Sequence, residues 1–246
     1  MIHAAKGVSQ QNHTVGRGRV FRGPLFLLCR NVCLPGTACE WYDKAMRRGR
    51  TKTLKKGGAH MPEKHAWTRW FWGVMGACAL AQLVLAGATA GYAADYNTFW
   101  AWALRVVEEG FSGFYAEGYF ADYPPGGILL LWPLGKLAQL LHISHASAFA
   151  RCLLAAPGIL AGMGLAALCY RLAGPGRARG FVLGVAAGAS PALLYVTGVW
   201  KQMDMVYLLF LVACFAALGK RRLFAAALCW GAALALKPQA LILGPV

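Results

Sequence analysis

The sequence predicts an all-α protein, a polytopic bundle of about five transmembrane helices with one further helical excursion after the first span. Apolar residues make up 58% of the 246 residues and charged residues only 14%, which is too hydrophobic for a soluble domain of this size. Apolar runs recur at about the 20 residues that a helix needs to cross hydrocarbon, and basic residues gather at their ends. The predicted spans are residues 67–91, 148–170, 180–199, 204–219 and 223–246.

The first 60 residues differ from the rest of the chain. They hold 12 of the 25 basic residues against only Glu40 and Asp43, and their one apolar patch, residues 24–28, is too short to span a membrane. We expect either a disordered basic leader or a mis-assigned start, with Met61 as the alternative first residue. The remaining 13 bases and 7 acids lie mostly at span ends, so we expect a lipid bilayer as partner and no nucleic acid.

Loop charges predict the topology. Lys64 and Arg69 place the front of the first span in the cytoplasm, so residues 92–127 emerge on the other side. The Arg-rich segment 171–179 and the basic segment 220–222 then also lie in the cytoplasm. We therefore predict a multi-pass protein of the plasma membrane whose residues 92–127 face the non-cytoplasmic side.

This topology requires that residues 126–145 do not cross the bilayer, because a crossing there would move both basic segments outside. The segment is short and contains Pro133 and Lys136, and short apolar runs are commonly interfacial or re-entrant. We predict a juxtamembrane or re-entrant helix.

Asp95 stands at the start of an amphipathic helix in the first external loop. Polar residues such as Arg105 and Glu108 alternate there with an apolar stripe at helical spacing, which predicts a helix lying in the plane of the membrane. Asp95 is a candidate functional carboxylate, and a helix N-cap is the alternative role. The apolar stripe consists of Phe99, Trp102, Ala103, Val106 and Val107.

The motif DYPPGG follows in the same loop. Asp122, Tyr123, Pro124 and Pro125 are expected to shape the site, because the prolines stiffen the chain before it turns into the next apolar segment. An ordinary structural turn is the alternative.

Ionisable residues also occur at or inside the later spans. In WKQMD, Lys201 and Asp204 either join Asp95 at one membrane depth or merely snorkel and cap a helix. Lys237 lies inside an apolar run beside Pro238, where an ammonium needs an anion or a water-filled cavity. We therefore treat Lys237 as a functional residue.

Four elements in this order, AADYNTFWAWAL, ADYPPG, WKQMD and LKPQAL, make residues 65–246 resemble the N-terminal part of a GT-C type glycosyltransferase. The resemblance is to enzymes that use dolichyl-type polyprenyl phosphate sugars, and to their bacterial mannosyltransferase-like relatives. It implies that Asp95 is the general base for transfer of a hexose, with inversion, to a hydroxyl of a glycan, lipid or protein.

The resemblance also suggests where the donor binds. We expect Lys237, Lys201 and Gln202 to bind the donor phosphate, with no metal and no further cofactor. The apolar stripe that begins at Phe99 and the segment 126–145 are expected to cradle the isoprenoid tail of the donor. The related patch often begins Trp-Gly-Gln, so the phosphate role of Lys201, which occupies the glycine position, is our own inference.

Two other functions fit the sequence. A transporter or flippase subunit would also use helices broken at Pro191 and Pro238, and an inactive membrane-assembly protein would use the aspartates as caps. The chain ends inside an apolar run at Val246, so we expect a fragment of a longer protein, and lack of activity of this fragment on its own is an alternative.

Overall fold

The computed structural model describes residues 64–243, and every regular element in that range is helical. Three helices are long and apolar enough to cross a membrane, His65–Ala88, Ala148–Ala173 and Ala178–Trp200, and two apolar helices are shorter, Asp204–Gly219 and Leu223–Leu236. The predicted all-α fold and membrane character are confirmed, whereas these lengths establish three candidate spans and not five. The predicted leader, residues 1–60, lies outside the described residues.

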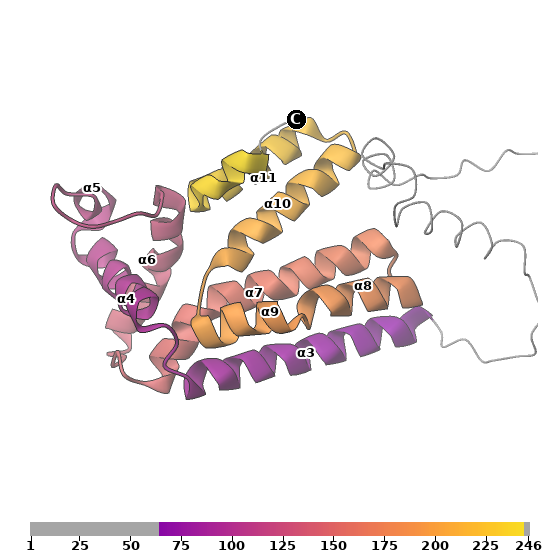
Figure 1. Cartoon of the computed structure of the whole chain (residues 1–246), viewed down its shortest axis with the longest axis horizontal. Helices are drawn as coiled ribbons and strands as arrows, with labels where there is room; N and C mark the ends of the chain where they lie inside the picture. The colour runs from indigo at the N-terminus through magenta and orange to yellow at the C-terminus, as the bar shows by residue number, and fades with distance from the viewer. Residues whose placement is uncertain (1–63, 244–246) are drawn as a thin grey trace, which may run out of the picture. The chain divides into compact units, whose positions relative to one another are not determined.

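The three long segments lie side by side in Figure 1. They are α3 (Lys64–Ala88), α7 (Ala148–Ala173) and a third that runs from α8 (Ala178–Gly188) through α9 (Pro191–Leu194) into the π-helix η1 (Tyr195–Trp200). The third segment changes geometry before Pro191, because proline removes a backbone donor and restricts the residue before it.

Two more helices continue the back-and-forth course of the chain. They are α10 (Asp204–Gly219) and α11 (Leu223–Leu236), and the short 3₁₀ helix η2 (Pro238–Leu243) follows. Figure 1 shows the α7–α8 and α10–α11 connections at the opposite end of the bundle from α4 and α6. The basic turns are thus separated from the predicted site, as the charge pattern indicated.

Glycines allow close packing within the bundle. A Cβ atom would lie 2.7 Å from Phe71 at Gly184, 2.6 Å from Met75 Sδ at Gly188 and 2.7 Å from the Gln202 carbonyl oxygen at Gly158. These small residues therefore let the helix backbones approach closely. At Gly162 the nearest atom would be 4.0 Å away, which is ordinary contact.

The segment between α3 and α7 folds into a separate layer at the end of the bundle (Figure 1). It contains α4 (Ala93–Glu108), α5 (Gly110–Phe114) and α6 (Pro125–Leu140). α4 and α6 cross at Gly135, where a Cβ atom would collide with the Ala103 carbonyl oxygen. Of the predicted segment 126–145, residues 126–140 thus belong to a helix packed on α4.

The apolar stripe of α4 is buried, but its predicted partner was wrong. Phe99, Trp102, Ala103 and Val106 are all at most 4% exposed, and they form one core with residues of α6 and of the loop between them. Because protein already covers this face, it cannot cradle an isoprenoid tail.

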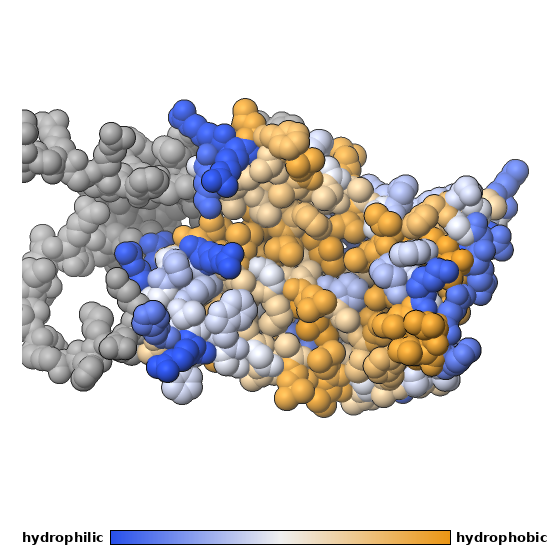
Figure 2. Space-filling view, turned by 180° about the vertical axis from the view of Figure 1, so that it is seen from behind, coloured by the Kyte–Doolittle hydropathy of each residue, from blue (hydrophilic) through white to orange (hydrophobic). Residues whose placement is uncertain are grey.

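Figure 2 shows the hydropathy of one face of the described residues. Hydrophobic side chains cover the middle of this face, and hydrophilic side chains gather toward both ends. That distribution suits a protein whose middle contacts hydrocarbon and whose ends contact water and headgroups.

Candidate functional site

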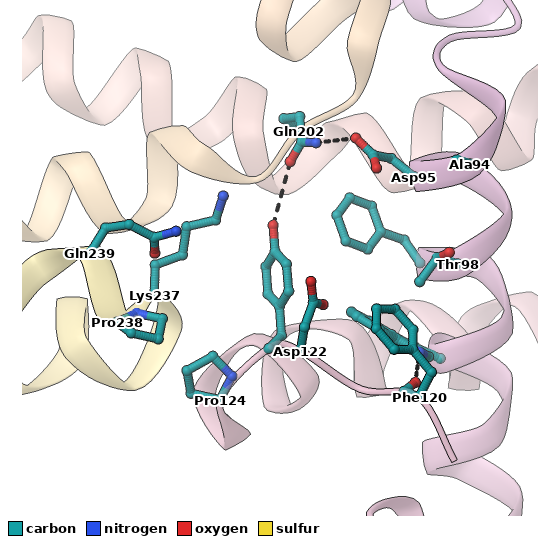
Figure 3. A pocket seen from close by; sticks show the side chains of 13 residues that line it. Ala94, Asp95, Thr98, Phe120, Asp122, Pro124, Gln202, Lys237, Pro238 and Gln239 are labelled. Carbon is teal, nitrogen blue, oxygen red and sulfur yellow. Dashed lines mark hydrogen bonds between the residues drawn. The ribbon is translucent and has the colours of Figure 1, made fainter. Parts of the chain in front are cut away.

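A cavity of about 380 Å³ lies at the end of the bundle that carries α4 and α6 (Figure 3). Its walls come from four segments: the start of α4, the loop before α6, the turn after η1 and the end of α11. Six of the predicted site residues line it, namely Asp95, Asp122, Tyr123, Pro124, Gln202 and Lys237. Residues that are separated by more than 100 positions in the chain therefore meet around one space.

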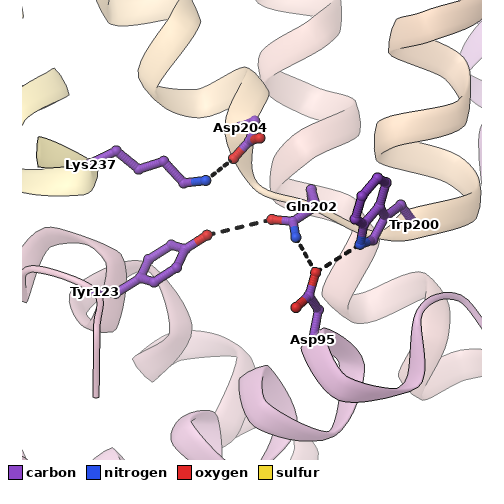
Figure 4. Close-up of polar contacts among 6 residues, drawn as sticks. All are labelled: Asp95, Tyr123, Trp200, Gln202, Asp204 and Lys237. Atoms are coloured by element: carbon purple, nitrogen blue, oxygen red, sulfur yellow. Dashed lines mark hydrogen bonds and ion pairs between the residues drawn. The ribbon is translucent and has the colours of Figure 1, made fainter. Parts of the chain in front are cut away.

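The carboxylate of Asp95 is held by two side-chain donors. Trp200 Nε1 donates to Asp95 Oδ2 over 2.7 Å, and Gln202 Nε2 donates to the same oxygen (Figure 4). Because both of these described donors use Oδ2, they leave Oδ1 for a ligand in the cavity.

Asp95 does not cap its helix. The N-cap of α4 is Tyr92, so Asp95 is the third residue of the helix, and the alternative prediction of an N-cap role is wrong. A carboxylate in the first turn is still favoured by the partial positive charge of the helix N-terminus.

The π-helix η1 brings both donors to Asp95. Lys201, directly after η1, has a left-handed backbone with φ +69°, a conformation that is uncommon outside glycine and asparagine. Trp200 and Gln202 consequently point to Asp95 while the lysine between them points away. π-helical turns are rare and occur frequently at functional sites.

Lys201 is buried beneath this turn and does not line the cavity. Its side chain is 1% exposed, and its ammonium donates to the Thr89 carbonyl (2.9 Å), the Thr89 hydroxyl (3.2 Å) and the Val199 carbonyl (2.9 Å). Burial lowers the pKa of Lys201, and Arg151 lowers it further. The structure thus does not place its ammonium to contact a phosphate in the cavity.

Lys237 occupies the opposite wall and forms an ion pair with Asp204 (Figure 4). Lys237 is 18% exposed and Asp204 34%, so the pair is partly shielded from water. Burial disfavours the ammonium, but hydrogen bonds and charge from Asp204 and Tyr123 outweigh it and raise the pKa of Lys237. The anion and the cavity expected beside this lysine are both present.

Tyr123 lies between the two charged walls. Its hydroxyl faces Gln202 Oε1 at 3.5 Å, and the Lys237 ammonium lies 5.2 Å from the centre of its ring. Burial raises the pKa of Tyr123, which keeps the hydroxyl neutral. Gln202 therefore contacts Asp95 through its nitrogen and Tyr123 through its oxygen.

The rest of the DYPP motif starts α6. Pro124 is the N-cap and Pro125 the first helical residue, a position that suits proline because its nitrogen needs no partner there. Pro125 does not line the cavity, whereas the exposed Asp122 does. The motif thus forms part of the cavity wall and begins α6.

Sequence reasoning missed Trp200 as a donor to Asp95 and gave Asp204 no definite partner. Trp200 is two residues from Gln202, and only the π-helix and the left-handed Lys201 place both on one side. The alternative prediction that Asp204 caps a helix is wrong, because the N-cap of α10 is Met203.

The comparisons with known proteins give no match to a protein family, to a curated protein or to a solved structure. Within residues 64–243, no three His, Cys, Asp or Glu side chains come together as metal ligands would. The function is therefore inferred from the geometry of the site.

Proposed function

We propose that the protein is a membrane glycosyltransferase that moves a hexose from a polyprenyl phosphate sugar to an acceptor hydroxyl, with Asp95 as general base. The observation that carries the proposal is the cavity itself, which has a positioned carboxylate on one wall and a partly buried ammonium on the other. Such a transfer needs a base for the acceptor and a positive charge for the leaving phosphate.

The proposed step is a single displacement. The acceptor oxygen attacks the anomeric carbon, its proton passes to Asp95 Oδ1, and the bond from that carbon to the phosphate oxygen breaks. The phosphate oxygen keeps the electron pair, so polyprenyl phosphate leaves with one more negative charge, and the configuration at the anomeric carbon inverts.

The surrounding residues would support this step in different ways. Trp200 and Gln202 fix the orientation of the base through Oδ2. A carboxylate that is already oriented lowers the entropic cost of reaching the transition state. Lys237 would offset the charge of the leaving phosphate. Gln202 acts in this proposal mainly through Asp95, because its amide nitrogen is already engaged there.

The membrane setting supports a lipid-linked donor. The cavity opens at an end of a bundle whose middle is hydrophobic (Figure 2), so a donor headgroup could enter it while its tail stays in hydrocarbon. We place the cavity on the non-cytoplasmic face of the plasma membrane, because the basic turns lie at the other end. The acceptor would be a hydroxyl of a glycan, lipid or protein.

Transfer from several radiolabelled polyprenyl phosphate sugars to membrane acceptors tests the proposal. The protein is expected to transfer label, and Asp95→Asn is expected to abolish transfer while membrane insertion is unchanged. Glu117→Gln, which removes an exposed carboxylate of the same loop, is the matched control and is expected to transfer normally. Full activity of Asp95→Asn would eliminate the proposed base.

A further inference from the structure

The ion pair between Lys237 and Asp204 puts a carboxylate where the proposed donor phosphate would bind. Lys237 lines the cavity, but its ammonium is in contact with Asp204 Oδ1. Any phosphate that approaches Lys237 must therefore compete with Asp204 or share the ammonium with it.

Few other contacts hold Asp204 in place. Among the described residues its Oδ1 is buried without a hydrogen-bond donor, so the Lys237 ammonium is the group that neutralises it there. Asp204 is also the first residue of α10, and backbone N–H groups at a helix N-terminus favour a carboxylate. Asp204 could thus lose Lys237 to a ligand without becoming an isolated charge.

The two lipid ligands of the proposed reaction differ in charge. The donor is a phosphodiester with one negative charge, whereas the product is a phosphate monoester that carries about 1.5 to 2 negative charges at neutral pH. A carboxylate next to the phosphate repels the product more than the donor, because like charges placed side by side disfavour binding.

We infer that Asp204 is a specificity-determining residue that pairs with Lys237 and favours binding of the polyprenyl phosphodiester donor over the phosphomonoester product. The inference rests on the proposed function. It gives the chain a means of releasing product, which otherwise would bind the ammonium more tightly than the donor does.

Direct binding tests the inference without sugar transfer. The full chain in lipid nanodiscs is titrated with polyprenyl phosphate, with its methyl phosphodiester and with the parent polyprenol. Asp204→Asn is expected to bind the monoester about tenfold more tightly than wild type and the methyl diester with a clearly smaller gain. Asp204→Glu keeps the charge and is expected to retain the wild-type preference.

Controls separate this inference from the proposed function. Glu117→Gln removes an exposed carboxylate that does not line the cavity and is expected to change neither affinity more than about twofold, because solvent screens an exposed charge. Unchanged polyprenol binding shows that the Asp204→Asn variant is folded.

Each outcome decides one of the two ideas. Suppose that wild type binds both phosphates better than polyprenol. If Asp204→Asn then leaves the ratio of the two affinities unchanged or binds the monoester more weakly, Asp204 is a structural partner and the inference is overturned. If wild type binds neither phosphate better than polyprenol, the donor site of the proposed function fails, and the inference fails with it.

Discussion

The two walls of the cavity are built differently. Asp95 stands on α4, whose buried face joins an aromatic core in which Trp102 is 2% exposed and its Nε1 donates to the Phe120 carbonyl over 3.1 Å. Lys237 follows α11, and the core between α10 and α11 has the small buried residues Ala233 and Ala240 beside Leu211, while its aromatic residues, such as Tyr207 and Trp230, are only partly buried. The proposed base is thus on a wall with a buried aromatic core, and the ammonium is on a wall whose aromatic residues are partly exposed.

The two lysines show the same contrast. Lys201 lies behind the turn that holds Asp95, and its ammonium contacts only neutral oxygens in the described structure. Lys237 belongs to the other wall and contacts a carboxylate that a ligand could replace. A fixed geometry suits a base, and an exchangeable ion pair suits the binding and release of an anion, so the walls correspond to two functional parts.

Gly135→Ala should break the α4 wall of the cavity. The added methyl group would collide with the Ala103 carbonyl at the crossing of α4 and α6, and overpacking costs about 1 to 3 kcal/mol. We expect a lower melting temperature in detergent and loss of transfer, measured by thermal unfolding and radiolabel assay.

Gly231→Ala is the matched control, because nothing lies within 4 Å of its Cβ position in α11. Alanine is favoured over glycine inside a helix by roughly 0.5 to 1 kcal/mol, so stability should be unchanged or slightly higher. Equal melting temperatures for the two variants would contradict the described crossing.

Lys201→Met should separate positioning from binding. The methionine leaves the carbonyls of Thr89 and Val199 without this donor, at a cost of about 1 to 3 kcal/mol for a buried group, and frees the turn that carries Trp200 and Gln202. A small displacement of a catalytic group can reduce the rate about a hundredfold. We expect kcat to fall by that order while KM for the donor stays close to wild type.

A raised donor KM with unchanged kcat would instead assign Lys201 to the phosphate. Circular dichroism and gel filtration of Lys201→Met establish whether the variant is folded. The variant is informative because Lys201 is outside the cavity.

The sequence predicted the helices and the residues that meet, but not how the residues meet. The elements around Asp95, Tyr123, Gln202 and Lys237 were found because aspartate, lysine and a Tyr-Pro-Pro turn are conspicuous next to apolar spans. The helical spacing of the apolar residues predicted that the stripe of α4 is buried. Such spacing cannot distinguish burial against lipid from burial against α6.

The role of Lys201 could not be predicted for a different reason. The direction of its side chain depends on the left-handed backbone of Lys201, which follows a π-helix. No residue of WKQMD indicates either of these conformations. The long-range partners Asp204 and Lys237, 33 positions apart, likewise meet only after α10 and α11 pack together.

Lys237→Met should weaken donor binding and leave the α4 wall of the cavity unchanged. Loss of a charge-assisted hydrogen bond to the phosphate costs about 1.5 kcal/mol or more, which corresponds to roughly tenfold in affinity. We expect donor KM to rise by about that factor with a smaller change in kcat, the reverse of the effect of Lys201→Met. Steady-state kinetics at several donor concentrations measures both parameters.

A donor KM that does not change in Lys237→Met would remove the lysine from the donor site. Lys136→Met, in α6 and outside the cavity lining, is the matched control and should leave both parameters unchanged.

The pH dependence of donor binding should show the smallest effect and identifies the lysine responsible. Asp204 and Tyr123 raise the pKa of Lys237 above its ordinary value of 10.5, so its ammonium stays charged through the neutral and mildly alkaline range. The donor phosphodiester does not titrate there either. We therefore expect donor KM to change less than about twofold between about pH 7 and about pH 9. Burial lowers the pKa of Lys201, so Lys201 would lose its charge at a lower pH than Lys237. A loss of donor binding with rising pH in wild-type steady-state kinetics would therefore contradict the assignment of the phosphate to Lys237.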